Sequence, residues 1–162
     1  MSPTSKTARD LVAQLELVPH PEGGWYRETH RSNEIISTGR GPRSALTAIY
    51  YLLETPQFSR WHVVASDEIW HFHDGAPLEL LVYRPATREL SSRVLGSPSG
   101  GYEALVSVRA GEWQAARSLG EWTLAGCDVG PGFDFEDFQF IASLDGHQSH
   151  FNDALAEYRK LL

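Results

Sequence analysis

The sequence contains a single cysteine, Cys127, among its 162 residues. One cysteine cannot form an internal disulfide, so a reducing compartment is the simpler expectation. No apolar run approaches the roughly 18 residues that a membrane helix needs. The first ten residues, MSPTSKTARD, also lack the apolar core of a secretory signal. We therefore expect a cytoplasmic protein that does not enter a membrane.

Lysine is scarce as well, since only Lys6 and Lys160 occur, and 21 acidic residues outnumber 14 basic ones to give a formal charge of −7. Without a basic stripe, binding to nucleic acid through phosphate neutralisation is not expected. Hydrophobic residues at 41% and charged residues at 22% are typical of a folded globular chain. The length predicts one domain over residues 1–162.

Helical periodicity is found near the two ends of the chain. The segment from about 7 to 16 has apolar residues at the spacing of one helix face, and Thr7 with Asp10 forms a capping pair. The segment from about 152 to 162 carries basic residues in its last turn, as the helix dipole favours. Its apolar stripe consists of Phe151, Leu155, Tyr158 and Leu162. We expect a short helix at each end.

Between these segments, from about residue 24 to 145, short strand-like runs alternate with glycine and proline turns. Two examples are ALTAIYYLL (residues 45–53) and LELLVYR (residues 78–84). Many short strands at a spacing of roughly 8–12 residues indicate an all-β sandwich or barrel. The terminal helices can then cover sheet faces or edges.

The stretch SRWHVVASDEIWHFHDG (residues 59–75) gathers three histidines and a glutamate on two successive strands. Side chains alternate between the two faces of a strand. By this parity His62 can face Glu68 across the two strands. His71 and His73 point the other way, toward a second layer, an interface or the surface.

The same stretch resembles the first motif of the cupins, which are small jelly-roll barrels. That motif is His-x-His, three or four residues, Glu, six residues and Gly, and His62, Glu68 and Gly75 fall on this spacing. Val64 stands where the second histidine belongs. In the second cupin motif, Gln114 stands where a histidine belongs.

Longer blocks extend the resemblance over nearly the whole chain. HPEGGWYRETHRS (residues 20–32), SDEIWHFHDGAPLELL (66–81) and the run from 110 to 140 are similar to the fifth cupin family, long known as a domain of unknown function. The resemblance implies a double-stranded β-helix, the cupin jelly-roll barrel, that assembles as a homodimer. It implies no established reaction.

A metal centre is one hypothesis for the pocket. Typical cupin sites hold iron, manganese or zinc with three histidines and a glutamate, whereas this chain offers His62, Glu68 and Gln114. An amide oxygen is a weaker ligand for a transition metal than an imidazole. Water could complete the shell of a divalent transition metal, but we favour a pocket that works without a metal.

The favoured hypothesis makes His62 and Glu68 a catalytic pair. Burial beside Trp70 and Phe72 would raise the proton affinity of Glu68, and His62 would act in the opposite direction. Such a pair can exchange protons near neutral pH. By analogy with cupin sugar epimerases, we expect an epimerase or isomerase acting on a small polar or sugar-like metabolite. Trp70 and Phe72 would either fill the core or form aromatic walls for the ligand.

Further ligand contacts are expected from residues outside this stretch. Arg27 can bind a carboxylate or phosphate, or pair with an acid structurally. Gln114 would contact the ligand, and the resemblance places Phe133 and Asp134 near the barrel mouth. Two other functions stay open: a non-catalytic small-ligand binder, and a metal-dependent oxygenase or isomerase.

Overall fold

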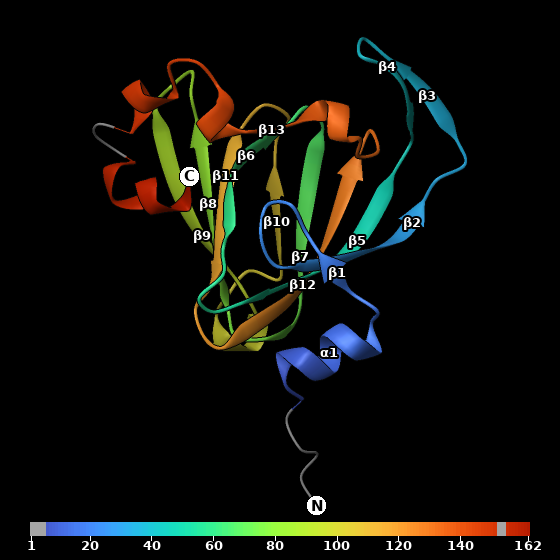
Figure 1. Ribbon diagram of the computed structural model, residues 1–162, viewed down its shortest axis with the longest axis vertical. Helices are drawn as coiled ribbons and strands as arrows, with labels where there is room; N and C mark the ends of the chain where they lie inside the picture. The colour runs from blue at the N-terminus through green and yellow to red at the C-terminus, as the bar shows by residue number, and fades with distance from the viewer. Residues whose placement is uncertain (1–5, 152–154) are drawn as a thin grey trace, which may run out of the picture.

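Glycine and proline turns divide the chain into antiparallel strands that form two facing sheets (Figure 1). The computed structural model describes residues 6–151 and 155–162. The all-β prediction is confirmed. No helix within the described part of the chain is long and apolar enough to span a membrane.

The first sheet has six strands in the order β1-β2-β5-β12-β7-β10. Their bounds are β1 Val18–Pro19, β2 Trp25–Arg31, β5 Thr47–Glu54, β7 Asp67–Gly75, β10 Leu105–Val108 and β12 Trp122–Gly130. The second sheet has five strands in the order β13-β6-β11-β8-β9. Their bounds are β6 Ser59–Val64, β8 Leu78–Arg84, β9 Glu89–Leu95, β11 Trp113–Ser118 and β13 Phe138–Phe140.

A separate hairpin of β3 (Ile35–Thr38) and β4 (Gly41–Ser44) stands away from the two sheets in Figure 1. Short 3-10 turns complete the structure. They are η1 Pro98–Gly100, η2 Phe135–Asp137, η3 Ile141–Ser143, η4 His147–His150 and η5 Ala156–Leu161.

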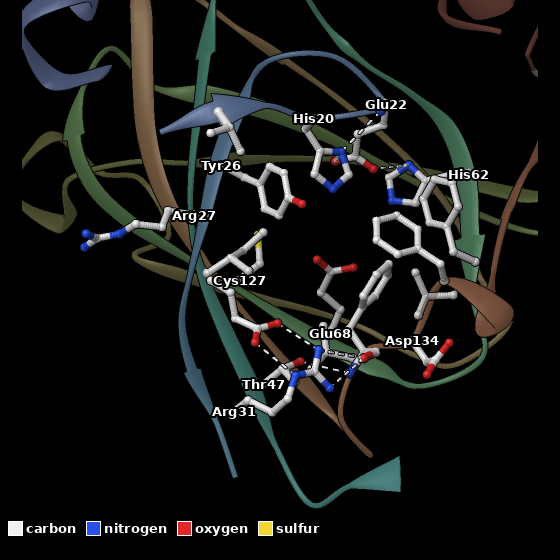
Figure 2. A pocket seen from close by; sticks show the side chains of 18 of the residues that line it. His20, Glu22, Tyr26, Arg27, Arg31, Thr47, His62, Glu68, Cys127 and Asp134 are labelled. Carbon is white, nitrogen blue, oxygen red and sulfur yellow. Dashed lines mark hydrogen bonds and ion pairs between the residues drawn. The ribbon is translucent and has the colours of Figure 1, made fainter. Parts of the chain in front are cut away.

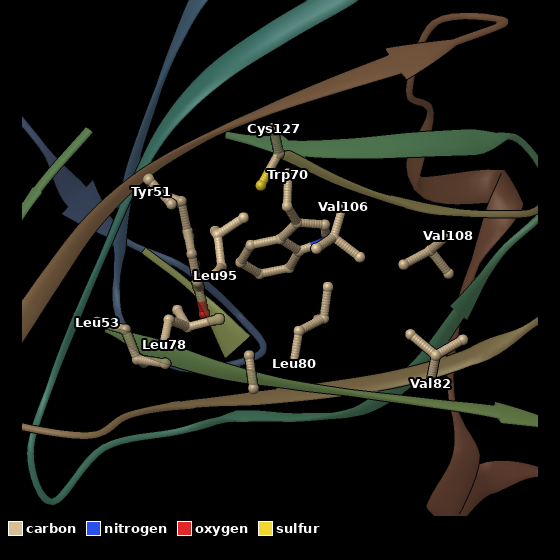
Figure 3. Packing of buried hydrophobic residues seen from close by; sticks show 12 residues of the cluster. Tyr51, Leu53, Trp70, Leu78, Leu80, Val82, Leu95, Val106, Val108 and Cys127 are labelled. Carbon is tan, nitrogen blue, oxygen red and sulfur yellow. The ribbon is translucent and has the colours of Figure 1, made fainter. Parts of the chain in front are cut away.

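The main core lies between the sheets (Figure 3). Large side chains such as Tyr51 and Trp70 of the first sheet meet Leu80 and Leu95 of the second, and all four are at most 1% exposed. Apolar area removed from water contributes about 25 cal/mol per Å². This packing therefore holds the sheets face to face and closes one part of the space between them.

The N-terminal helix is present as α1, Ala8–Gln14, with the capping box of Thr7 and Asp10 that the sequence predicts. Leu11 and Leu17 pack against Leu52 of β5 on the outer face of the first sheet. Because both strand faces are then covered at this point, β5 reads as an almost continuous apolar run.

The C-terminal segment differs from the expected helix over 152–162. Residues 152–154 lie outside the described residues, and the part from Ala156 to Leu161 is a 3-10 turn without a side-chain cap. Phe151, Leu155 and Leu161 are nevertheless buried on the outer face of the second sheet, against Trp61. Packing against the sheet, rather than helix propensity, sets the path of this segment.

Candidate functional site

A cavity of about 540 Å³ opens between the sheets beyond the main core. Side chains from β2, β5, β7 and β12 form one wall, and side chains from β6 and β13 form the other. The segment before β2 and the loop at 133–135 close its remaining sides (Figure 2). This volume suits a small metabolite.

Glu68 and His62 both line this cavity, as strand parity predicts. Glu68 on β7 is 7% exposed and His62 on β6 is 2% exposed. Burial raises the pKa of Glu68, and the neighbouring His62 opposes that rise. Burial also lowers the pKa of His62, and Glu68 opposes that fall. The pair therefore favours its uncharged forms more than either group would in water.

Glu22 is a second buried carboxyl at the cavity, and sequence reasoning missed it. Its Oε2 lies 3.2 Å from Nδ1 of His62. Burial raises the pKa of Glu22 to about 8. At neutral pH this side chain is mainly a carboxylic acid, able to donate a proton.

His20 is the fourth buried titratable group of the cavity, and it was missed as well. Its Nδ1 accepts the backbone N–H of Glu22 at 3.2 Å, and its ring stands edge-on to Tyr26 with centroids 4.6 Å apart. Burial lowers the pKa of His20 to about 4. The neutral ring then carries its proton on Nε2, on the side that Figure 2 shows facing the cavity.

Backbone hydrogen bonds hold the turn that carries His20 and Glu22. His20 N–H donates to the carbonyl of Gly24 at 3.0 Å, and Tyr51 Oη donates to the carbonyl of Gly23 at 2.7 Å. Arg60 N–H donates to the carbonyl of Glu22 at 3.0 Å. The turn is therefore fixed by β5 and β6, which are distant in sequence.

The tautomer of His62 follows from its backbone contact. Its Nδ1 lies 2.7 Å from the carbonyl oxygen of Arg60, which can only accept a hydrogen bond. Nδ1 therefore carries the proton and Nε2 has a free lone pair. Figure 2 shows Nε2 directed into the cavity, and Phe138 stacks on the ring at 5.2 Å.

The cavity mouth is built around Arg31, which the sequence did not single out. Its guanidinium binds Glu28 at 2.8 and 2.9 Å and the carbonyl of Phe133 at 3.2 Å. Phe133 and Asp134 line the cavity, in agreement with the expected position of their loop. Arg27 contributes to the wall, but Figure 2 shows its guanidinium turned away from the cavity.

Trp70, Phe72 and Gln114 are not placed as the sequence suggested. Trp70 and Phe72 belong to the core between the sheets instead of the cavity wall. Gln114 is 1% exposed and links Trp70 to Glu68. Parity gives the correct face for these side chains, but it does not show how far along the strand the core ends and the cavity begins.

The donor set does not fit a cupin metal centre. The indole N–H of Trp70 can only donate, so it takes the amide oxygen of Gln114 at 2.9 Å. The amide N–H of Gln114 then donates to Glu68 at 2.5 Å. Gln114 is therefore held with its oxygen on Trp70 and its nitrogen on Glu68, and Val64 has no ligand atom. Among residues 6–151 and 155–162, no group of three His, Cys, Asp or Glu side chains is arranged to hold a metal ion.

His71 and His73 face away from the cavity, as parity predicts. Nε2 of His71 lies 2.9 Å from Asp128 on the neighbouring strand β12. His73 stands edge-on to Tyr50 at 5.8 Å and lies over Gly126. Both histidines thus belong to the outer surface of the first sheet.

Comparison with known proteins agrees with this architecture. Residues 9–141 match the family Cupin_5, described as "Cupin superfamily (DUF985)". The chain belongs to this family. The cupin resemblance is thereby confirmed, together with the double-stranded β-helix that it implied.

Similar cupins come from distant organisms. This cupin is 32% identical to the protein SO0799 from Shewanella oneidensis, with a TM-score of 0.82 and 97% and 98% of the two chains covered. A hypothetical protein from Leishmania major is 29% identical, with a TM-score of 0.82 and coverage of 94% and 98%. The uncharacterized protein YML079W of Saccharomyces cerevisiae is 29% identical over 155 residues, covering 85% of this chain and 76% of that protein.

More remote structures share only the fold. The oxalate decarboxylase of Bacillus subtilis is 14% identical with a TM-score of 0.59, over 89% of this chain and 36% of that one. The dTDP sugar isomerase of Desulfovibrio desulfuricans G20 is 11% identical with a TM-score of 0.55, over 81% and 90%. Reactions as different as these show that the fold does not determine the chemistry.

Proposed function

We propose that this cupin binds a small polar metabolite in the cavity and transfers protons to and from it, as an epimerase or isomerase does, without a metal. The observation that carries the proposal is the meeting of two carboxyls and two imidazoles in one cavity. Burial raises the pKa of Glu22 and Glu68 and lowers that of His20 and His62. Carboxyls that keep their proton near neutral pH, beside imidazoles that stay in their neutral form, are suited to general acid–base catalysis.

His62 is the base in this proposal. Its Nε2 lone pair takes a proton from a carbon next to a carbonyl. The C–H electron pair becomes the C=C bond of an enolate, and the π pair of the carbonyl moves onto its oxygen. Glu22 Oε2 lies 3.2 Å from Nδ1, and the imidazolium that results favours loss of the Glu22 proton to solvent, after which the carboxylate stabilises the positive ring. A proton delivered by Glu68 to the other face of the same carbon inverts that centre, and it leaves Glu68 ionised and His62 protonated until solvent resets both groups. In a substrate with a hydroxyl on that carbon, transfer of the hydroxyl proton to the enolate oxygen and of the His62 proton to the former carbonyl carbon moves the carbonyl instead.

Two neutral donors can serve the enolate oxygen. The hydroxyl of Tyr26 points into the cavity in Figure 2, and the Nε2–H of His20 faces the same space. Donors fixed in a water-poor site stabilise developing negative charge more than water does. Glu68 is the second proton carrier, because Gln114 already fixes one of its oxygens at 2.5 Å.

The test is hydrogen exchange from solvent. Sugars and small carbonyl metabolites that raise the melting temperature are incubated with the protein in D2O, and deuterium uptake at carbon is followed by NMR. We expect His62→Ala and Glu68→Gln to slow the exchange by about 100-fold or more. His71→Ala, on the outer face, serves as the control and should exchange normally. Unchanged exchange in both cavity variants would refute the proposal.

A non-catalytic binder is the second candidate, favoured by the three phenylalanines, Phe133, Phe135 and Phe138, that line the cavity. A ligand that binds tightly and never exchanges a proton would support it. A metal-dependent cupin is the third candidate, and a stoichiometric transition metal in protein purified without added metal would support that one against the other two.

We also propose that the protein acts in the cytoplasm as a homodimer. The buried single cysteine, Cys127, is compatible with a reducing compartment. The exposed apolar side chains of the β3–β4 hairpin, Ile35 and Ile36, support association with a second copy.

A further inference from the structure

Carboxyl groups are more numerous than arginines and lysines along the cavity wall. The five carboxyls outnumber two guanidiniums, and no lysine occurs among the described lining residues. The acids are Glu16, Glu22, Glu28, Glu68 and Asp134, and the bases are Arg27 and Arg31. This excess matters for ligand choice because charges in a partly enclosed cavity are weakly screened.

Both arginines already have a carboxylate partner on the same wall. Arg31 binds Glu28 through two hydrogen bonds of 2.8 and 2.9 Å, and Arg27 lies 3.4 Å from Glu16. Arg31 also donates to a backbone carbonyl at the mouth. A negatively charged ligand would therefore have to displace an existing partner to reach either cation.

The other three acidic residues of the cavity wall have no arginine or lysine partner among the described residues. In the described part of the chain, no arginine or lysine lies within ion-pair distance of Glu22, Glu68 or Asp134. Two of them, Glu22 and Glu68, are more than nine-tenths buried. Burying carboxyls without a counterion is costly, and a ligand that supplies a positive charge offsets that cost.

Glu68 is aimed at the empty space. One oxygen accepts the amide of Gln114, and Figure 2 shows the carboxyl projecting into the cavity. Apart from the weak thiol donor of Cys127, no described side chain donates to its other oxygen. That oxygen is available to a donor on a ligand.

Aromatic rings line the same cavity. Phe133, Phe135 and Phe138 cluster with centroids 5.0, 6.1 and 6.4 Å apart, and Tyr26 lines the cavity as well. Ring faces attract cations within about 6 Å of the centroid, and quaternary ammonium groups are recognised by several rings together. Carboxyls and ring faces therefore favour the same kind of ligand.

We infer that the cavity recognises its ligand through an ammonium group, whose positive charge favours the carboxylate forms of Glu68 and Glu22, ion-pairs with them and packs against the phenylalanine rings. The inference rests on the proposed ligand site and deepens it, but it does not depend on proton transfer. Primary and quaternary ammonium groups share the required charge. The lone pair of His62 Nε2 stays free to act on a neighbouring carbon.

The test compares choline with 3,3-dimethylbutan-1-ol, a neutral molecule of nearly the same shape, by calorimetry on the full chain. We expect choline to bind about tenfold more tightly, and the anion 3,3-dimethylbutanoate to bind most weakly. Equal affinities, tighter binding of the anion, or no choline binding at millimolar concentration would overturn the inference.

Two variants and one control test whether the preference for choline over the neutral alcohol arises in the cavity. Glu68→Gln should reduce the preference for choline to less than about threefold, and Phe138→Leu should reduce it independently. Glu34→Gln removes the same charge from an exposed site and should leave the preference unchanged. Melting curves establish that each variant is folded, and a full preference in both cavity variants would overturn the inference.

Failure of this inference is distinguishable from failure of the proposed function. If a neutral carbonyl compound without an amine exchanges deuterium through His62, ammonium recognition is wrong and the proposed function stands. If choline binds as expected and no carbonyl compound exchanges deuterium, ammonium recognition stands and the proposed proton transfer is wrong.

Discussion

Glu22 and His20 lie two residues apart in one turn, and folding moves their pKa values in opposite directions. The pKa of Glu22 rises from its ordinary 4.5 to about 8, so the folded protein holds a proton that the unfolded chain releases. The pKa of His20 falls from 6.5 to about 4, so the unfolded chain takes up a proton that the folded protein does not. Raising the pH from 4.5 to 8 thus weakens the fold through Glu22, and lowering it from 6.5 to 4 weakens the fold through His20.

Replacing Glu22 with glutamine isolates the first effect. Glu22→Gln removes the carboxyl, so its stability relative to the wild type should rise by roughly 2–4 kcal/mol between pH 5 and pH 8. Urea unfolding at both pH values measures this difference in the free energy of unfolding. Because His20 is present in both proteins, its own pH dependence cancels in the comparison. The exposed variant Glu34→Gln should show no comparable change. A stability difference that does not depend on pH would contradict the assignment.

At the scale of elements, two glycines with left-handed backbone have unequal roles. Gly75 ends β7 with φ +91°, and a Cβ there would lie 2.6 Å from the carbonyl oxygen of Trp122. Gly111 precedes β11 with φ +82°, and a Cβ would meet nothing within 4 Å. The first position therefore combines a left-handed backbone with a close approach, whereas the second requires only the backbone conformation.

Alanine at these positions should separate the two requirements. We expect Gly111→Ala to cost about 1–2 kcal/mol, the price of a left-handed alanine. Gly75→Ala should cost more than about 3 kcal/mol, because the backbone of β12 would have to move. Chemical denaturation of the two variants gives the comparison. Equal losses would mean that the approach to Trp122 contributes nothing.

Strand parity accounts for what the sequence could predict about the site. It correctly placed His62 and Glu68 on one cavity and turned His71 away, because side-chain direction alternates whatever the strand packs against. Parity does not show at which residue along a strand the core ends and the cavity begins. Trp70, on the same face as Glu68 and two residues further on, therefore proved to be core.

The turn at residues 20–24 shows why the remainder of the site was missed. His20 and Glu22 lie in an irregular segment, where no period assigns a face. Their positions depend on hydrogen bonds to Tyr51 and Arg60, which are distant in the sequence. The one available signal was a polar pair directly before two glycines and a strand. That pattern suggests a fixed turn but does not show what it faces.

At the scale of the whole molecule, the two ends of the chain cover the two outer faces of the barrel. Helix α1 packs on the first sheet through Leu11, and the C-terminal segment packs on the second through Phe151 and Leu161. The β3–β4 hairpin projects from the barrel in Figure 1 and is tied to it by Arg43, whose guanidinium binds Asp137. Ile35 is 62% exposed, and Leu46, just beyond the hairpin, is 41% exposed.

An exposed two-stranded hairpin with apolar side chains is a surface on which another chain can pair or pack. If this surface joins two copies, light scattering should give twice the 18.1 kDa mass of the chain at micromolar concentration. Ile35→Lys would bury a charge in that interface and should yield the monomer mass with an unchanged fold by circular dichroism. Leu119→Lys introduces the same charge at a site that is 51% exposed, on the turn between β11 and β12, and should stay dimeric. A monomeric wild type would mean that the ligand cavity functions within a single barrel, and an Ile35→Lys variant that stays dimeric would place the interface elsewhere on the molecule.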